Sequence, residues 1–170
     1  MNLASISKVY RKTLFLMIVS FYNFAYTQPV LPQRTITLNP SQALSFGTFC
    51  DNSGVGGTIS IDWQGIRTTT GGIVALPSSP GLPAIFDVKL CQGRNIKITY
   101  PQTSTLTNSA GQSLILDIGP TEKGGNGAIF STEKNCNFIT ILRVGATLHI
   151  PPNTIIGKYK GSFTVSFDQQ

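Results

Sequence analysis

The chain has 170 residues and a formal net charge of +6, from 13 Lys and Arg against 7 Asp and Glu. Glycine (17) and proline (10) are frequent, which argues against a helical bundle or a coiled coil because both residues disfavour helices. Charged residues make up only 12% of the chain and hydrophobic residues 41%, which argues against a disordered protein. The length is that of a single domain.

Residues 1–27 have the pattern of a secretory signal peptide. Three cations between residues 8 and 12 precede a short apolar run, 14–21, and the small residues Ala25 and Thr27 follow it. The run is too short to cross a bilayer comfortably, because a membrane helix needs about 20 apolar residues. We therefore expect cleavage near Thr27, export to the periplasm, the outer surface or the medium, and no integral membrane span afterwards. An uncleaved N-terminal anchor is the alternative.

Residues 28–42 are an N-terminal extension with a possible first strand, and residues 43–170 form the predicted single domain. Apolar and polar residues alternate with a period of two along this sequence, the pattern of half-buried strands. The alternating segments are 35–38, 44–49, 59–63, 86–90, 96–100, 114–118, 142–150 and 163–167. Clusters of Gly, Pro and Asn separate them. Seven to eight short strands with this spacing predict an all-β fold, an antiparallel β-sandwich or barrel.

Three cysteines, Cys50, Cys91 and Cys136, lie beyond the predicted signal peptide. An exported chain meets an oxidising environment, so we expect a disulfide; inert or intermolecular thiols are the alternative. Three single pairings are possible, and their loop entropies are too similar to choose between them. No two cysteines have a C-x-x-C spacing and the chain has one histidine, so the sequence indicates no metal site and no cofactor.

Catalytic chemistry has little support in the sequence. His149 is the only histidine, and strand alternation places it on the exposed face, opposite Leu148 and Ile150. The seven carboxylates are scattered along the chain. A hydrolase would need a deep cleft with two close carboxylates, or an acid beside His149. We therefore expect a protein that is not an enzyme.

Candidate ligand contacts are also few. Lys158, Tyr159 and Lys160 form the only tight basic cluster, and alternation directs the two lysines outward and Tyr159 inward. Nucleic-acid binding calls for a dense basic face with stacking aromatic residues, so it is not expected. Trp63 and Tyr159 are the aromatic residues on which a glycan-binding surface would depend. Trp63 shares the parity of the preceding strand residues, so a core position is its alternative.

Three groups of motifs resemble one protein family. The first group is LSFGTF (44–49), GGTISI (56–61) and RTTTGGIV (67–74), the second is AIFDV (84–88) and IKITYP (96–101), and the third is RVGATL (143–148), PN (152–153) and GKYKGSFTV (157–165). Together they resemble DUF4402, a domain of unknown function of exported bacterial proteins. That family is similar in pattern to chaperone–usher pilins and spore-coat-U-type subunits, so the resemblance implies an immunoglobulin-like, pilin-like β-sandwich.

The resemblance also implies a role. It is that of an exported, non-catalytic structural or interaction protein, a fimbria-like or cell-surface subunit; a secreted glycan- or cell-surface-binding module is the alternative. Its partners would be further copies, neighbouring pilin-like subunits and a periplasmic chaperone. By comparison with pilins, a disulfide would join Cys50 to Cys91, with Cys136 as an alternative partner.

A pilin-like sandwich lacks one strand, and a neighbouring subunit supplies it. The N-terminal stretch around Val30, Ile36 and Leu38 is the candidate donor. Three prolines interrupt this stretch, and proline lacks the N–H that a strand ladder needs. The competing expectation is that residues 35–38 pair within their own domain.

Overall fold

The computed structural model describes residues 36–90, 94–135 and 137–170, which belong to one compact unit, Arg34–Gln170. The described residues contain twelve β-strands and no α-helix. Accordingly, no helix capable of spanning a membrane occurs in this part of the chain. The predicted signal peptide, residues 1–27, lies outside the described residues.

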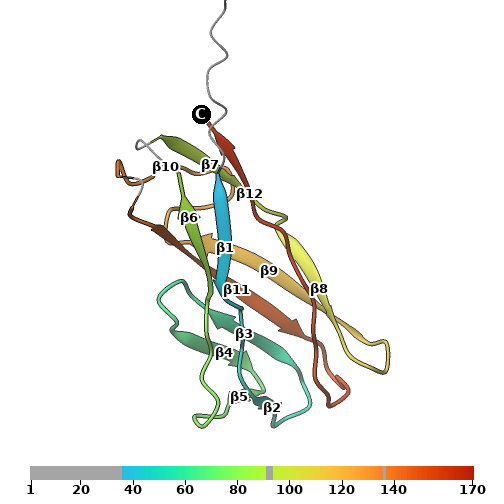
Figure 1. The fold of residues 1–170 in the computed structure, drawn as a ribbon. Coiled ribbons are helices and arrows are strands. Elements are labelled where there is room, and N and C mark those ends of the chain that lie inside the picture. The colour runs from blue at the N-terminus through green and yellow to red at the C-terminus, as the bar shows by residue number, and fades with distance from the viewer. Residues whose placement is uncertain (1–35, 91–93, 136) are drawn as a thin grey trace, which may run out of the picture. The chain divides into compact units, whose positions relative to one another are not determined.

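The strands are short and pair antiparallel throughout (Figure 1). In chain order they are β1 (Thr37–Gln42), β2 (Phe49–Asp51), β3 (Gly57–Ile61), β4 (Arg67–Gly71), β5 (Ile73–Ala75), β6 (Ala84–Lys89), β7 (Asn95–Thr99), β8 (Thr103–Thr107), β9 (Ser113–Thr121), β10 (Ile129–Ser131), β11 (Thr140–Ile150) and β12 (Ser166–Gln169). The prediction of an all-β, antiparallel fold is confirmed. The finer assignment, an immunoglobulin-like sandwich, stays a prediction.

Seven strands form one large sheet around β11, the longest strand. One edge of β11 pairs with β9, which pairs in turn with β8. The other edge is shared by two branches: Thr140–Val144 pairs with β6, which carries β1, and Ala146–Ile150 pairs with β3, which carries β4. The sheet therefore branches at Gly145 (Figure 1).

Gly145 is buried at this branch point. A Cβ atom there would lie 2.5 Å from the carbonyl oxygen of Ile61 and 3.0 Å from the Cα of Asp62. Any side chain would push away the backbone that follows β3, because real Cβ atoms do not approach backbone so closely. Glycine is thus required at this position for β11 to change its strand partner from β6 to β3 along the same edge.

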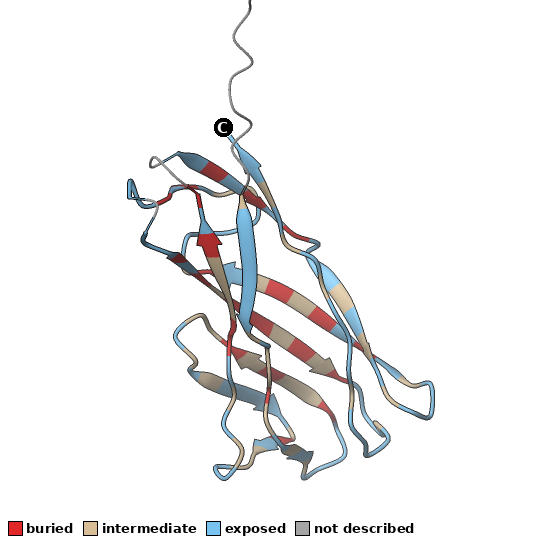
Figure 2. Cartoon of the chain, in the orientation of Figure 1, coloured by how far each residue is buried: buried red, intermediate tan, exposed pale blue. Residues whose placement is uncertain are grey.

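Two smaller sheets, β10–β7–β12 and β2–β5, contribute to the same hydrophobic core as the large sheet. Alternate residues of β9 and β11 are buried, as Figure 2 shows by the red bands along both strands. The most deeply buried large side chains are Ile59, Ile61, Val88, Ile96, Ile98, Leu114, Leu116, Leu142 and Val144. Removing these side chains from water is the main driving force for folding.

The structure has twelve strands where seven to eight were predicted. The additional ones are β4, β5, β8 and β10. The sequences of β4 (RTTTG) and β8 (TSTLT) show no apolar alternation because Leu106 is the one large apolar residue in the two strands. Strands β5 and β10 have three residues each, too few to show a period.

Arg67 ties β4 to the long connection before β6. Its Nη1 donates to the carbonyl oxygens of Phe46 at 3.2 Å and Ser79 at 2.6 Å, and its Nη2 donates to that of Leu76 at 2.8 Å. The guanidinium is half-buried and serves three backbone acceptors, of which the carbonyls of Phe46 and Ser79 have no other partner among the described residues.

Candidate functional site

The C-terminal part of the chain contains a stretch of extended backbone, residues 161–165, that belongs to no sheet (Figure 1). Before it, Lys160 pairs with Thr107 of β8, and after it β12 pairs with β7. None of the backbone N–H groups of residues 161–165 has a hydrogen-bond partner among the described residues. We call residues 161–165 the open edge.

The direction of the unpaired groups follows from the pairing at Lys160. Its N–H and its carbonyl both bond to Thr107, so both point toward β8. Backbone groups alternate in direction along an extended strand, so those of residue 162 point the same way, and the carbonyl of Ser162 accepts from the Ser104 hydroxyl at 3.0 Å. The groups of residues 161, 163 and 165 therefore point away from β8, with no described partner.

Apolar side chains hold the open edge against the domain. Phe163 and Val165 alternate along it and Phe167 of β12 continues the pattern, all three half-buried and packed against the core. The rings of Phe163 and Phe86 meet edge to face, with centroids 6.4 Å apart. Gly161 permits close passage along β8, because a Cβ there would lie 2.3 Å from the carbonyl oxygen of Thr105.

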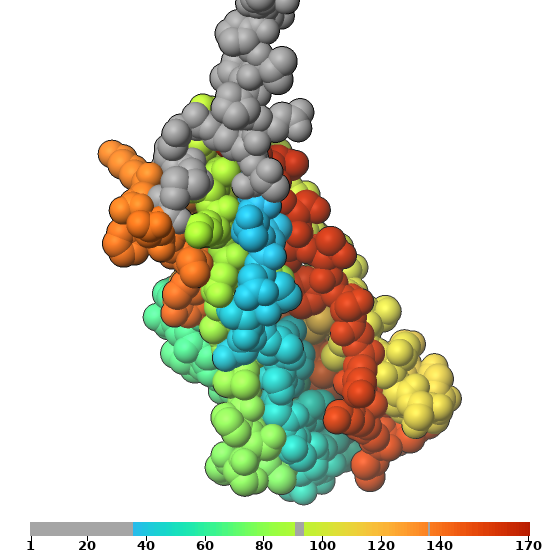
Figure 3. All heavy atoms as spheres, in the orientation of Figure 1, coloured from blue at the N-terminus to red at the C-terminus, as the bar shows by residue number. Residues whose placement is uncertain are grey.

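Strand β1 borders the C-terminal segment on the face visible in Figure 3. It pairs with β6 of the same chain, with Thr37 opposite Lys89 and Leu38 opposite Val88. No other described strand pairs with it, so its second edge is also unpaired.

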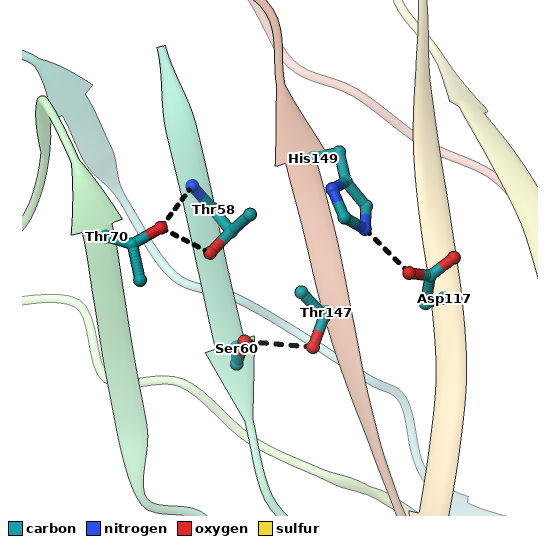
Figure 4. Close-up of polar contacts among 6 residues, drawn as sticks. All are labelled: Thr58, Ser60, Thr70, Asp117, Thr147 and His149. Carbon is teal, nitrogen blue, oxygen red and sulfur yellow. Dashed lines mark hydrogen bonds and ion pairs between the residues drawn. The ribbon is translucent and has the colours of Figure 1, made fainter.

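A second feature is a polar face on the outer side of the large sheet (Figure 4). Six side chains from four neighbouring strands form this polar face: Thr70 of β4, Thr58 and Ser60 of β3, Thr147 and His149 of β11, and Asp117 of β9. Their side chains hydrogen-bond across the strands, with 2.7 Å between the hydroxyls of Thr58 and Thr70 and 2.9 Å between those of Ser60 and Thr147. The outward position predicted for His149 is confirmed.

His149 has an acidic partner that the sequence did not indicate. Its Nε2 lies 2.6 Å from Oδ2 of Asp117, and the two side chains are 44% and 48% exposed. This is the acid beside the histidine that a hydrolase needs. A hydrolase would also need a nucleophile bonded to the imidazole, and no described hydroxyl makes that bond. The pair can bind a polar ligand or act as an ion pair when the imidazole is protonated.

Asp117 also lines a shallow depression of about 430 Å³ beside the polar face. Tyr100, Gln102, Pro120 and Asn126 contribute to its wall. Burial raises the pKa of the Tyr100 phenol, so this group stays neutral at physiological pH. The depression is open to solvent and lacks the enclosure that excludes water from hydrolytic sites.

The loop after β2 is organised by a carboxylate. Oδ1 of Asp51 accepts from the backbone N–H groups of Ser53 and Gly54, and Oδ2 accepts from that of Gly56, at 3.2, 2.8 and 2.8 Å. Burial raises the pKa of Asp51, but these hydrogen bonds, together with one from the Ser53 hydroxyl, outweigh it and hold the pKa below the ordinary 3.8.

The family model described as "Domain of unknown function (DUF4402)" matches residues 36–168. The chain belongs to the DUF4402 family. The match runs from just before β1 into β12, so it includes both the open edge and the polar face. Comparisons of this DUF4402 protein with curated proteins and with solved structures found no match.

The two predicted ligand-contact residues occupy different parts of the DUF4402 domain. Trp63 lies half-buried in the turn between β3 and β4, beyond the end of β3 at Ile61, so strand parity no longer applies to it. Tyr159 points inward, as predicted, and packs against the core. Its hydroxyl accepts from Asn108 Nδ2 and lies within hydrogen-bond distance of two acceptors, Gln112 Oε1 and the carbonyl of Ile155, all within the domain. The structure does not bring Trp63 and Tyr159 together as one aromatic surface.

The predicted disulfide involves residues that the structure describes only in part. Cys50 lies exposed on β2, opposite Val74 of β5. Its preferred partner, Cys91, and the alternative, Cys136, lie outside the described residues, so the pairing stays a prediction. Among the described residues, no group of three His, Cys, Asp or Glu side chains could hold a metal ion.

Proposed function

We propose that this DUF4402 protein is an exported, non-catalytic structural or interaction protein, a subunit of a fimbria-like or cell-surface assembly. The observation that carries the proposal is the open edge, where residues 161–165 present unpaired backbone groups beside alternating apolar side chains. A strand supplied by another molecule would satisfy these backbone groups and cover Phe163 and Val165.

Strand addition is favourable here because the acceptor is already ordered. The open edge is fixed at one end by the Lys160–Thr107 bridge and at the other by β12, so binding orders little of this chain. Each new backbone hydrogen bond contributes about 0.5–1.5 kcal/mol net, in addition to the burial of half-exposed apolar area.

The source of the added strand is constrained by β1. Residues 37–42 already pair with β6 of their own chain, so they do not serve as the donor. The donor would come from residues before 36 of a second copy or from a neighbouring pilin-like subunit. An exported chain with such an edge needs protection before assembly, which is the task of a periplasmic chaperone.

The proposal is tested by removing one backbone N–H of the open edge while changing the volume of the side chain as little as the substitution allows. Val165→Pro removes an N–H that points away from β8, and Val165→Thr is the matched control because it keeps the N–H and the shape of the side chain. We expect the wild-type protein and Val165→Thr to form oligomers on native sizing, and Val165→Pro to remain monomeric with a melting temperature close to that of the control. A wild-type protein that stays monomeric after heating and refolding would exclude the assembly role.

The polar face supports a second function, a glycan- or cell-surface-binding module. Its exposed hydroxyls, imidazole and carboxylate are the groups that hydrogen-bond sugar hydroxyls. Glycan-array binding that is lost in His149→Ala or Trp63→Ala would support this function. An array without signal for the wild-type protein would remove it.

A further inference from the structure

One end of the domain is formed by three loops: residues 52–56 between β2 and β3, 108–112 between β8 and β9, and 151–158 after β11. A Cβ on Gly56 would lie within 3 Å of the Ile150 carbonyl oxygen and of backbone atoms of Pro151 and Pro152, so the first loop adjoins the third. A hydrogen bond from the Ile155 N–H to Gln112 Oε1, at 2.7 Å, joins the third loop to the second.

Large apolar side chains project from these loops. Ile156 is fully exposed, at 101%, and Ile155 and Val55 are 52% and 63% exposed. We call these three residues the apolar tip. Exposed apolar residues need no explanation when scattered singly, whereas here two are adjacent at one loop apex and a third lies in the adjoining loop.

The tip is held rigidly. The Tyr159 hydroxyl lies 2.8 Å from the carbonyl of Ile155, and the Thr154 hydroxyl donates to the carbonyl of Pro151 at 2.6 Å. The side chain of Gln112 bonds both to the Ile155 N–H and to the Tyr159 hydroxyl. The backbone of Ile155, next to Ile156, is therefore fixed before any partner binds, and the Lys160–Thr107 bridge fixes the chain four residues further on, which lowers the entropy cost of binding.

The charge around the tip has one sign. The three loops contain no Asp or Glu, and Lys158 lies two residues beyond Ile156, with Lys160 two residues further on. Both lysines are exposed. The nearest carboxylate in sequence, Asp51, is occupied by backbone N–H groups of its own loop.

We infer that the apolar tip inserts into the interfacial region of an anionic lipid bilayer. A deformable lipid surface can accept a projecting apolar side chain such as Ile156 directly, whereas a protein partner would need a pocket that matches its shape. The lysines provide attraction to anionic headgroups, and their long aliphatic stems reach the interface. The inference goes beyond the proposed assembly role, because it places the domain against a membrane through loops separate from the open edge.

The test is co-sedimentation of the exported protein with vesicles of phosphatidylcholine alone or mixed with phosphatidylglycerol. We expect binding to the mixed vesicles, weakened by salt, and about tenfold weaker binding for Ile156→Ser. Lys158→Gln should bind about fivefold more weakly. Ile129→Ser is the matched control, because Ile129 is 56% exposed on β10, far from the three loops in Figure 1, and its binding should equal that of the wild type.

Ile156 has no packing to lose, so its variant should keep the wild-type melting temperature. A retained leader would contribute equally to every variant, so the comparison of Ile156→Ser with Ile129→Ser does not depend on cleavage. The inference is overturned if the wild-type protein ignores anionic vesicles, if it binds neutral and anionic vesicles equally, or if the two serine variants bind alike. Loss of self-assembly in Ile156→Ser with vesicle binding unchanged would also overturn it, since the tip would then contact protein.

Discussion

Tyr159→Phe removes a single oxygen atom from the network that holds the loop after β11. The Tyr159 hydroxyl has one proton and two acceptors within reach, Gln112 Oε1 and the Ile155 carbonyl, so it donates to one of them at a time. It also accepts from Nδ2 of Asn108 at 3.1 Å. Two hydrogen bonds are therefore lost, at about 1 kcal/mol each, for a total of about 2 kcal/mol of unfolding free energy.

The loss converts to a melting temperature through the entropy of unfolding. The compact unit Arg34–Gln170 has 137 residues, and about 2.1 cal/mol/K per residue gives an entropy of unfolding of about 0.29 kcal/mol/K. We expect Tyr159→Phe to lower the melting temperature by about 7 °C, measured by circular dichroism or calorimetry.

Tyr100→Phe is the matched control for this change. Tyr100 is buried, but its hydroxyl makes no hydrogen bond within the described part of the chain, so its removal should change the free energy of unfolding by less than about 0.5 kcal/mol. The reasoning is refuted if Tyr159→Phe melts like the wild type, or if both variants lose the same stability. In the first case the hydroxyl of Tyr159 would contribute nothing to the stability of the loop after β11.

Three further predictions concern the framework. Arg67→Lys keeps the charge but has one nitrogen in place of the two that reach these carbonyls, so chemical denaturation should show a loss of about 2 kcal/mol in the free energy of unfolding, whereas an unchanged midpoint would mean that the carbonyls find water instead. Gly145→Ala should cost about 2–3 kcal/mol in the same assay because its Cβ meets the backbone after β3, and a neutral result would contradict the branch point. The lowered pKa of Asp51 adds stability that is present above about pH 3.8 and is lost as the pH falls. The melting temperatures of the wild type and Asp51→Asn should therefore differ at pH 7 and converge in acid, and a difference that stays constant with pH would exclude this linkage.

The strands that could be predicted from sequence are those with one face exposed to solvent and the other buried in the core. In β7, β9 and β11 the buried residues fall on alternate positions, so the period of two is visible in the sequence. In β4 the side chains are mostly exposed, and in β8 the half-buried positions hold Ser104 and Leu106, so only one apolar residue marks the inner face. The pairing order could not be predicted, because the exchange of partners at Gly145 depends on a backbone approach that leaves no local pattern.

The candidate site was predictable to the same extent. Alternation alone placed His149 outward and Tyr159 inward, since both depend only on the parity of neighbouring residues. The partner of His149 is Asp117, 32 residues away, and the β9–β11 register shifts between Val144 and Ala146, on the side of the pair nearer the connection between the strands. The open edge was missed because its alternation of apolar residues is that of a paired strand, and the absence of a partner cannot be read from one sequence.

Net charge is a poor guide to partners in this protein, because several cations serve the domain itself. The guanidinium of Arg67 is used by backbone carbonyls, and Nη1 of Arg143 lies 2.9 Å from Oε2 of Glu122. The position of a cation in the fold is the better guide to partners. Lys158 and Lys160 follow the exposed residues Ile155 and Ile156, and the three neighbouring loops contain no Asp or Glu.

Two residues of the apolar tip, Ile155 and Ile156, lie on the same continuous segment as the open edge, residues 151–165, so the two proposals need separable variants. Val165→Pro changes a backbone donor beyond the Lys160 bridge, and Ile156→Ser changes a side chain before it. If strand addition and membrane contact are independent, the first variant loses assembly and keeps vesicle binding, and the second does the reverse. If each variant loses both activities, assembly and vesicle binding depend on the segment as one unit. The Lys160–Thr107 bridge is then the element that couples the open edge to Ile156, because it fixes the segment between them.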